Sequence, residues 1–188
     1  SGTGKSLIAK CLHYNSLRAH QPFVEINCAS IPGTLLESEL FGYEAGAFTD
    51  AKRQKKGLVE MAHGGTLFLD EIGEMEPALQ AKVLQLIDEK CFRRVGGTKS
   101  IAIDVRIVAA TNRDLKKAVE DGFFRSDLYY RLNVIDIHLP SLRERKEDIY
   151  ELIGHMLGEF GGGAGRPAPC FTPAALDLLA AYDWPGNV

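Results

Sequence analysis

The chain opens with a glycine-rich hexapeptide, SGTGKS, whose residue types and spacing suit phosphate binding. Glycines let successive backbone N–H groups turn toward phosphate oxygens, and a helix that follows points its positive end at the same place. In such a loop Lys5 neutralises the β- and γ-phosphates, and the Ser6 hydroxyl ligates Mg2+. The last six positions of the pattern GxxxxGK[ST] are matched by Ser1, Gly2, Thr3, Gly4, Lys5 and Ser6. The alternative is a glycine-rich turn before a helix, with an exposed lysine.

An acidic pair, Asp70 and Glu71, ends the apolar run TLFLDE. A carboxylate at the end of a buried strand lies where the helix after a phosphate-binding loop begins. Asp70 can therefore hold Mg2+ directly or through water, and Glu71 can polarise an attacking water. Two solvated acids at a strand end are the plain alternative. Because GKS precedes them in the chain, the pair favours a site for a nucleotide and Mg2+.

Two asparagines also follow apolar runs, Asn112 in AATN and Asn27 in FVEIN. Neighbouring parallel strands end at one edge of a sheet, so the amide of Asn112 can reach the attacking water or the γ-phosphate. The alternative is that Asn112 caps a helix that starts near Asp114. Asn27 has the same two interpretations.

The segment FFRSDLYYRLNV carries Arg125 and Arg131, with aromatic residues between them. A guanidinium can stabilise charge on a transferring phosphoryl group, and it often arrives from a neighbouring subunit. The alternative is surface pairing of these arginines with Asp127 or Asp121. Taken alone, the residues favour surface pairing.

The elements that must position these residues alternate between strands and helices. We expect strands within PFVEIN, GGTLFLDE, DVRIVAATN and NVIDIHLP. Helices are expected after SGTGKS, within IPGTLLESELFG up to Gly42, and over PALQAKVLQLIDEK with Pro77 near its start. The first helix would bury a face that contains Leu7, Ile8, Cys11, Leu12 and Leu17. The strand centres are apolar without a period of two, which predicts an α/β fold with a parallel sheet and helices on both faces.

A change in composition separates a smaller part of the chain from this sheet. Three consecutive glycines and two prolines in residues 161–169 predict a mobile connector, and Thr172 with Pro173 predicts the start of a last helix. The expected organisation is an α/β subdomain at 1–140 and a helical subdomain at 141–188.

Composition limits the class of protein. The chain has 188 residues, of which 45% are hydrophobic and 25% charged, enough for one well-cored domain and a small appendage. No apolar run approaches the roughly 20 residues that span a bilayer, so we expect no membrane partner. The formal net charge of −3 gives no reason to expect nucleic-acid binding by this segment. The four cysteines form no CxxC pair, which favours a reducing cytoplasm.

Several blocks in this order resemble the central AAA+ ATPase domain of bacterial enhancer-binding proteins, the activators of sigma-54 RNA polymerase. The resemblance covers almost the whole chain, which is far more specific than a phosphate-binding loop alone. Its blocks are SGTGKS, INCAS, ESELFGYEAGAFT, GGTLFLDEIGEM, RRVGG, VRIVAATNRDL, FRSDLYYRLNV, LPSLRERKEDI and WPGNV.

The resemblance implies roles for the residues above. SGTGKS would be the Walker A loop of an AAA+ P-loop NTPase, and Asp70 with Glu71 its Walker B pair. Asn112 would be sensor I, and Asn27 the switch residue that holds the catalytic glutamate. Arg125 and Arg131 would be arginine fingers, which imply a hexameric or heptameric ring with each site completed at a subunit boundary. The residues from Leu142 onward would form a small helical lid.

The segment GAFTDA, residues 46–51, resembles the family's GAFTGA loop, which contacts sigma-54. Phe48 would be its exposed apolar tip and Thr49 the polar neighbour. Leaving a Phe-sized side chain exposed forgoes about 1.5–3 kcal/mol relative to burial, which is reasonable if a partner covers it. The alternative is that Phe48 packs into its own domain. Asp50 replaces the second glycine, which could adopt positive φ more readily, and adds a negative charge beside the tip.

The leading hypothesis from the sequence is an ATP-hydrolysing activator that remodels the sigma-54 polymerase closed complex and binds enhancer DNA through a domain outside these residues. The alternative is a nucleotide-responsive regulator that does not remodel sigma-54, and a third reading is a non-catalytic AAA+ scaffold. Because position 1 falls inside the loop pattern and WPGNV ends the chain, we expect a fragment cut at both ends. By itself it would bind nucleotide poorly and stay monomeric.

Overall fold

The structure, a computed structural model, describes residues 2–161 and 170–188 and divides into two compact units. The larger unit is Lys5–Asp136, and the smaller joins Ser1–Gly4 to Ile137–Val188. The expected mobile connector falls almost entirely on residues 162–169, which lie outside the described residues. The predicted boundary between residues 140 and 141 stays a prediction.

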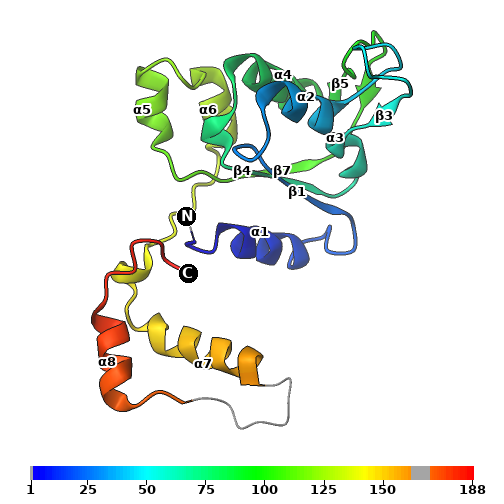
Figure 1. The fold of residues 1–188 in the computed structure, drawn as a ribbon. Coiled ribbons are helices and arrows are strands. Elements are labelled where there is room, and N and C mark those ends of the chain that lie inside the picture. Colours follow the sequence, from blue (N-terminus) through cyan, green and yellow to red (C-terminus); the bar gives the residue numbers. More distant parts are fainter. Residues whose placement is uncertain (1, 162–169) are drawn as a thin grey trace. The chain divides into compact units, whose positions relative to one another are not determined.

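The larger unit is built on a parallel sheet with the strand order β1-β4-β7 (Figure 1). In register, Asn27 of β1 lies opposite Asp70 of β4, and Leu69 of β4 lies opposite Ala109 of β7. The carboxyl ends of the strands therefore meet at one edge, as the sequence predicts for the polar residues that follow them. The strand bounds are β1 Phe23–Asn27, β4 Thr66–Asp70 and β7 Arg106–Ala109.

Helices cover both faces of this sheet. Figure 1 shows α1 on one face, with the other helices of the unit on the opposite face. Leu67 and Leu69 of β4 face the main apolar core. Thr66 faces the other side of the strand, where its hydroxyl and the ring of buried His13 of α1 share a 3.0 Å hydrogen bond. This alternation follows from the strand period of two. The helices of the unit are α1 Lys5–Tyr14, α2 Gly33–Phe41, α3 Leu58–Met61, η1 Ile72–Glu74, α4 Pro77–Glu89, α5 Leu115–Glu120 and α6 Ser126–Leu132.

Two short antiparallel ladders lie outside the parallel sheet, β2 with β3 and β5 with β6. The β2–β3 ladder forms the stem of the GAFTDA segment, with Gly42 opposite Lys56 and Tyr43 opposite Lys55. The bounds are β2 Gly42–Tyr43, β3 Lys55–Lys56, β5 Cys91–Phe92 and β6 Ile101–Ala102.

The smaller unit contains η2 Leu142–Glu144, α7 Asp148–Gly161 and α8 Pro173–Ala181. The predicted cap of the last helix is confirmed, since the Thr172 side chain accepts a hydrogen bond from the Ala175 N–H. The Arg145 guanidinium donates to the Thr3 carbonyl at 2.9 Å within the same unit.

Two local predictions were wrong. NVIDIHLP forms no strand in the described residues, and Val134 and Ile135 are 78% and 82% exposed. The segment pairs with no strand among residues 2–161 and 170–188, and the division between the two units falls inside it. The apolar face of α1 also differs, because Ala9 and His13 are its buried residues while Leu7 is 65% exposed. Ala9 and His13 are four residues apart, so they lie on the same side of the helix, and His13 contacts β4 through Thr66. The more apolar positions of α1 lie elsewhere on the helix.

Adjacent leucines on α2 give a matched test of this core. Leu36 is 1% exposed and Leu35 is 54% exposed. We expect Leu36→Ala to lower the free energy of unfolding by about 2–5 kcal/mol, because it leaves a cavity in the core. Leu35→Ala should change it by less than about 0.5 kcal/mol, as is usual for surface positions. Urea unfolding followed by circular dichroism measures both, and equal effects would contradict the packing described above.

Candidate active site

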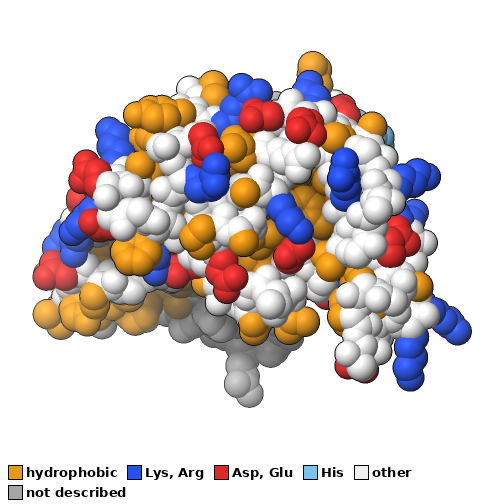
Figure 2. Space-filling model, turned by 90° about the horizontal axis from the view of Figure 1, so that it is seen from above, with side chains coloured by type: hydrophobic (Ala, Val, Ile, Leu, Met, Phe, Trp, Pro, Cys, Tyr) orange, Lys and Arg blue, Asp and Glu red, His pale blue; other side chains and the backbone are white. Residues whose placement is uncertain are grey.

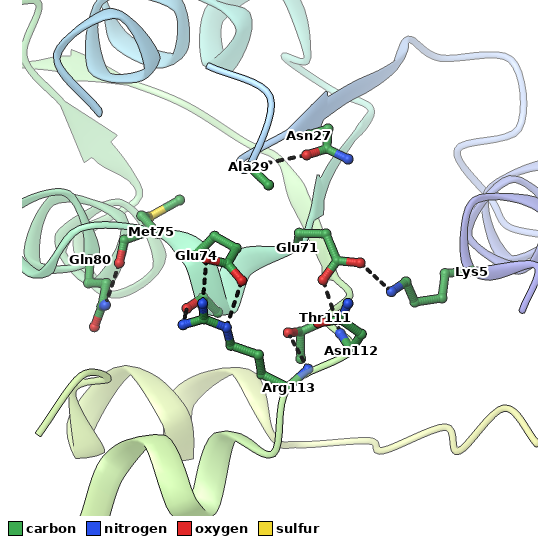
Figure 3. A network of polar contacts seen from close by, with 11 residues as sticks. Lys5, Asn27, Ala29, Glu71, Glu74, Met75, Gln80, Thr111, Asn112 and Arg113 are labelled. Carbon is green, nitrogen blue, oxygen red and sulfur yellow. Dashed lines mark hydrogen bonds and ion pairs between the residues drawn. The ribbon is translucent and has the colours of Figure 1, made fainter. Parts of the chain in front are cut away.

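Lys5 and Glu71 form an ion pair at the edge of the sheet where the strands end. Lys5 Nζ donates to Glu71 Oε1 at 2.6 Å, and the two side chains are only 15% and 14% exposed. Lys5 comes from the first turn of α1, and Glu71 directly follows β4 (Figure 3). Residues 66 positions apart in the chain are thus brought into contact at this edge.

The backbone of Glu71 adopts the left-handed conformation, with φ 52° and ψ 46°. This conformation is uncommon for a residue other than glycine and occurs where the surroundings impose it. The second carboxylate oxygen, Oε2, accepts a 3.0 Å hydrogen bond from the Asn112 backbone N–H. Burial alone raises the pKa of Glu71, but the hydrogen bonds from Lys5 and Asn112 outweigh it and lower the pKa. The carboxylate is therefore ionised at neutral pH.

Asp70 contacts Asn27 across the strand register. The Asn27 Nδ2 donates to Asp70 Oδ2 at 3.3 Å, and its Oδ1 accepts from the Ala29 N–H at 2.9 Å. The family resemblance implies that Asn27 holds the catalytic glutamate, yet here its side chain contacts the neighbouring aspartate. The reason is geometric, because the register sets Asn27 opposite Asp70 and the left-handed turn at Glu71 directs that side chain toward Lys5.

The residues present suit a magnesium ion. Burial and the charge of Glu71 raise the pKa of Asp70, whereas Lys5 lowers it in part, so a nearby cation would favour its ionised form. Ser6 follows Lys5 in the first turn of α1. No group of three or more His, Cys, Asp or Glu that could hold a metal occurs among the described residues. Mg2+ usually takes one or two protein oxygens and completes its shell with water and phosphate, and the Asp70 carboxylate and the Ser6 hydroxyl are oxygen ligands of this kind.

The remainder of the predicted phosphate loop belongs to the smaller unit. Gly2 and Gly4 have φ values of 71° and 96°, which glycine adopts without strain. Thr3 lies between them, and Ser1 lies outside the described residues. The loop glycines and the Lys5–Glu71 pair are therefore described in separate units.

A second ion pair braces the turn that carries Glu71. Arg113 binds Glu74 with N–O distances of 2.6 Å, and its Nη1 donates to the Gly73 carbonyl at 3.3 Å. Arg113 directly follows Asn112, so it ties the end of the β7 segment to η1 (Figure 3). Neither Arg113 nor Glu74 was predicted from the sequence, where both resemble ordinary surface residues and give no signal.

Both candidate arginine fingers are exposed and paired with acids of their own chain. Arg125 makes two hydrogen bonds to Asp127, at 3.0 and 2.7 Å, and Arg131 binds Asp88 at 2.7 Å. The hydrogen bond to Asp127 raises the pKa of Arg125. The surface pairing that the sequence analysis kept as an alternative is thus present at Arg125. In Figure 2 acidic and basic side chains are interspersed over the face seen from above.

The GAFTDA loop is closed by its own backbone. The Gly46 N–H donates to the Ala51 carbonyl at 2.8 Å, and the Ala51 N–H donates to the Phe48 carbonyl at 2.9 Å. The Phe48 ring is 45% exposed and packs edge-on against Tyr43, with 4.9 Å between ring centroids. Phe48 is therefore neither buried in the core nor fully exposed. Thr49 beside it is exposed.

Asp50 causes no backbone strain in this loop. It is absent from the non-glycine residues with positive φ, so the position does not need a glycine in this conformation. The substitution therefore changes the charge at the tip rather than the loop geometry.

The stem of the loop is packed at backbone distance. A Cβ placed on Gly42 would collide with the Lys55 carbonyl, and one on Gly57 would collide with the Leu40 carbonyl. The Gly42 carbonyl also accepts a hydrogen bond from the Val95 N–H at 2.9 Å. Arg94, next to Val95, forms ion pairs with Glu44, which follows β2, and with Glu60, which follows β3, each at 2.8 Å. The hydrogen bond from Arg94 lowers the pKa of Glu60.

Gln80 is a further polar residue that the sequence analysis missed. It is 0% exposed and forms hydrogen bonds with three backbone groups. Its position on α4 offered a signal, because it shares a face with Val83, Leu84 and Ile87. A glutamine at a core-facing position of an apolar stripe is uncommon unless its amide is satisfied.

Two other features lie near the site without joining it. Cys28 follows Asn27 and is 3% exposed, and its pKa is raised to about 12 by burial and by the charges of Asp70 and Glu71, so its thiol is neutral. A hollow of about 220 Å3 beside α5 is separate from the Lys5–Glu71 pair, and it is lined by Arg113, Asp114, Lys117, Ala118, Asp121 and Phe123. Among the described residues, no helix is both long and apolar enough to cross a bilayer.

Known families match both parts of the chain. The sigma-54 interaction domain matches residues 1–138, and the AAA+ ATPase lid domain matches residues 143–188. These matches confirm the predicted AAA+ α/β fold with a helical lid.

Relatives match along the full chain. A Nif-specific regulatory protein of Azotobacter vinelandii is 60% identical over 100% of this chain and 36% of its own length. The regulatory protein AtoC of Escherichia coli K12 is 55% identical over 100% of this chain and 41% of its own length. The crystal structure of NtrX from Brucella abortus in complex with ADP is 40% identical, with a TM-score of 0.92 over 100% of this chain and 41% of that chain. The chain therefore spans about two fifths of the length of the relatives it matches, and it belongs to the sigma-54 interaction domain family of AAA+ ATPases.

Proposed function

We propose that this chain is the ATP-hydrolysing core of a transcriptional activator that remodels the sigma-54 RNA polymerase closed complex. The observation that carries the proposal is the meeting of Lys5, Glu71, Asp70 and the Asn112 main chain at one edge of the sheet. The relative NtrX, solved with ADP and also with ATP, supports nucleotide as the ligand.

Glu71 would act on the attacking water. Its lowered pKa keeps the carboxylate ionised, and Asn112 fixes one of its oxygens while leaving the other to Lys5. A γ-phosphate that binds Lys5 would replace Glu71 Oε1 as the lysine's partner, and this oxygen would then be available to polarise water for in-line attack. Substrate binding and release of the catalytic carboxylate would thus be a single exchange of partners.

Mg2+, when bound, would supply a positive charge that offsets the developing charge on the phosphate oxygens. Asp70 would hold it directly or through water, and Ser6 would add its hydroxyl. The loop residues Ser1, Gly2, Thr3 and Gly4 would direct backbone N–H groups to the phosphates.

Arg125 and Arg131 would complete the site of a neighbouring subunit in a hexameric or heptameric ring. Each guanidinium now binds a carboxylate of its own chain, in exposed pairs of the kind that contribute little to stability. A phosphate with two or more negative charges can compete for such a guanidinium. The fingers would therefore exchange partners when subunits assemble around ATP.

The Phe48–Thr49 tip would transmit hydrolysis to sigma-54. Phe48 keeps almost half of its surface exposed although Tyr43 lies beside it, so a partner can bury the remainder. The whole protein would reach enhancer DNA through a domain outside these residues, and it would act in the cytoplasm of a bacterium.

Asp50 favours a second candidate function, a nucleotide-responsive regulator that does not remodel sigma-54. The loop accepts Asp50 without strain, so its negative charge is the feature that would weaken contact with a partner suited to an uncharged tip.

The catalytic role of Glu71 can be tested in the full-length protein with Glu71→Gln. We expect ATP binding to be retained or slightly tightened, because Lys5 loses a charged competitor, while kcat falls by about 100-fold or more. The exposed acid on the same segment, Glu76→Gln, serves as the control and should keep parental turnover. Hydrolysis by Glu71→Gln at the parental rate would exclude the proposed role.

The role of the loop tip can be tested with Phe48→Ala and Thr49→Ala. We expect both variants to keep their ATPase activity and to lose open-complex formation with sigma-54 polymerase in a heparin-resistance assay. Phe171→Ala is the matched control, because Phe171 is 44% exposed and Phe48 is 45% exposed. Unchanged open-complex formation by Phe48→Ala and Thr49→Ala would favour the second candidate function.

Asp50→Gly and Asp50→Asn separate charge from backbone freedom at the tip. If the loop engages sigma-54 as it stands, the parent forms open complexes and both variants behave like it. A parent that is inactive with sigma-54 polymerase, together with activity in both variants, would assign the block to the charge. Activity in Asp50→Gly alone would show instead that the extended loop needs positive φ at this position.

A further inference from the structure

Gln80 is a buried polar side chain that the proposed reaction does not use directly. Its Nε2 donates to the Met75 carbonyl at 2.7 Å and to the Phe123 carbonyl at 3.0 Å, and its Oε1 accepts from the Arg125 N–H at 2.8 Å. Carbonyls only accept and a backbone amide only donates, so these partners also fix which way the side-chain amide points. The residue is 0% exposed.

The three partners belong to two segments with different functions. Met75 follows η1, the turn that begins just after Glu71 (Figure 3). Phe123 and Arg125 belong to the segment that leads into α6, where Arg125 occupies the position before the first helical residue. One side chain therefore joins the end of the turn that follows Glu71 to the backbone of the candidate finger.

Packing alone does not require a glutamine at this position. Its neighbours on the buried side of α4 are apolar, and a Met or Leu would fill a similar volume without polar atoms to satisfy. Apolar side chains on either side of Arg125 already dock this segment, since Phe124 is 3% exposed and Leu128 is 0% exposed. What the glutamine adds is a directional hold on the main chain at Arg125, whose own side chain is exposed.

We propose that Gln80 is a positioning residue for the arginine finger. It fixes the main chain at Arg125 to the turn that follows Glu71, so that the guanidinium reaches the neighbouring subunit's phosphate from a set place. This inference rests on the proposed function, because it takes Arg125 to act in a neighbour's site. A displacement of about 1 Å in a positioned group can cost about 100-fold in rate, so losing this hold is expected to reduce turnover strongly.

The test uses the full-length protein with Gln80→Met, which removes all three hydrogen bonds at similar volume. Gln85→Met is the matched control, because Gln85 lies on the same helix and is exposed, and its side chain donates a hydrogen bond to Glu89 on the surface of that helix. We expect Gln80→Met to bind ATP like the parent and to lower kcat by about 100-fold with little change in KM. Parental kcat in Gln80→Met would overturn the proposal.

Mixed rings show in which subunit the defect acts. Gln80→Met is co-expressed with Glu71→Gln under different affinity tags, and assemblies that carry both tags are purified. A site is active when the Gln80→Met subunit supplies the intact Glu71 and its Glu71→Gln neighbour supplies the intact finger. Random mixing of equal amounts places the subunits in this order at about a quarter of the interfaces, so activity there should be restored. Absence of recovery would place the defect in the residue's own site and overturn the proposal.

A control mixture separates this inference from the proposed function. Arg125→Ala mixed with Glu71→Gln should recover activity in the same way, and failure of this pair would refute shared sites and thus the proposed function itself. If only the Gln80→Met mixture fails, the inference alone is wrong. Should Gln80→Met not fold, Gln80→Leu removes the same three hydrogen bonds at similar volume, and it should show the same recovery in mixed rings. Failure of both variants to fold would make Gln80 a stability residue and overturn the proposal.

Discussion

The parallel pairing of β1, β4 and β7 is the constraint on which the candidate site depends. The three strands end at one edge of the sheet, so the short polar segments that follow them must converge there. Asn27, Asp70 and Asn112 reach the edge in this way, and α1 brings Lys5 to the same place from the other side of the sheet. A one-residue slip between β1 and β4 would move Asn27 away from Asp70 and would also turn the buried side of the strand outward.

The Lys5–Glu71 pair concentrates opposite charges in a region with little access to water. Removing charges from water is costly, and their mutual attraction offsets this cost only when the geometry and the remaining hydrogen bonds are good. Here the Asn112 N–H satisfies the second oxygen of Glu71, and the ion pair between Arg113 and Glu74 lies on the turn that follows it. In the proposed function, phosphate oxygens would take the place of one carboxylate oxygen at Lys5.

Much of this fold could be predicted from the sequence because its signals are local. Apolar runs followed by polar residues located β1, β4 and β7, and the glycine after α2 marked its end. The run NVIDIHLP misled, because an apolar segment becomes a strand only where a neighbour offers a free edge. In α1, His13 is buried and Leu7 is exposed, and His13 contacts Thr66 of β4. The spacing of apolar residues along the helix cannot predict a contact of this kind.

The candidate site was predictable in its members but not in its contacts. Motifs identified Lys5 and Glu71 as members of one site, but the ion pair between them was not predicted. The contact of Asn27 with Asp70 depends on strand register and on one unusual backbone conformation. Gln80 was overlooked although its place on the apolar face of α4 was a signal, because the sequence does not show which buried backbone groups it would contact. Its importance becomes visible only when the buried carbonyls and N–H group around it are counted.

The stem of the GAFTDA loop has a consequence for how such loops can change over evolutionary time. At Gly42 and Gly57 the facing backbones leave no room for any side chain, so almost every mutation there would force the two arms apart. The tip is less crowded, because a Cβ on Gly46 would meet nothing within 4 Å, although the φ of 84° at this residue still favours glycine. Asp50 is not among the non-glycine residues with positive φ, so it occupies the tip without backbone strain. New recognition chemistry can therefore arise at the tip one residue at a time, while the arms that carry it stay the same.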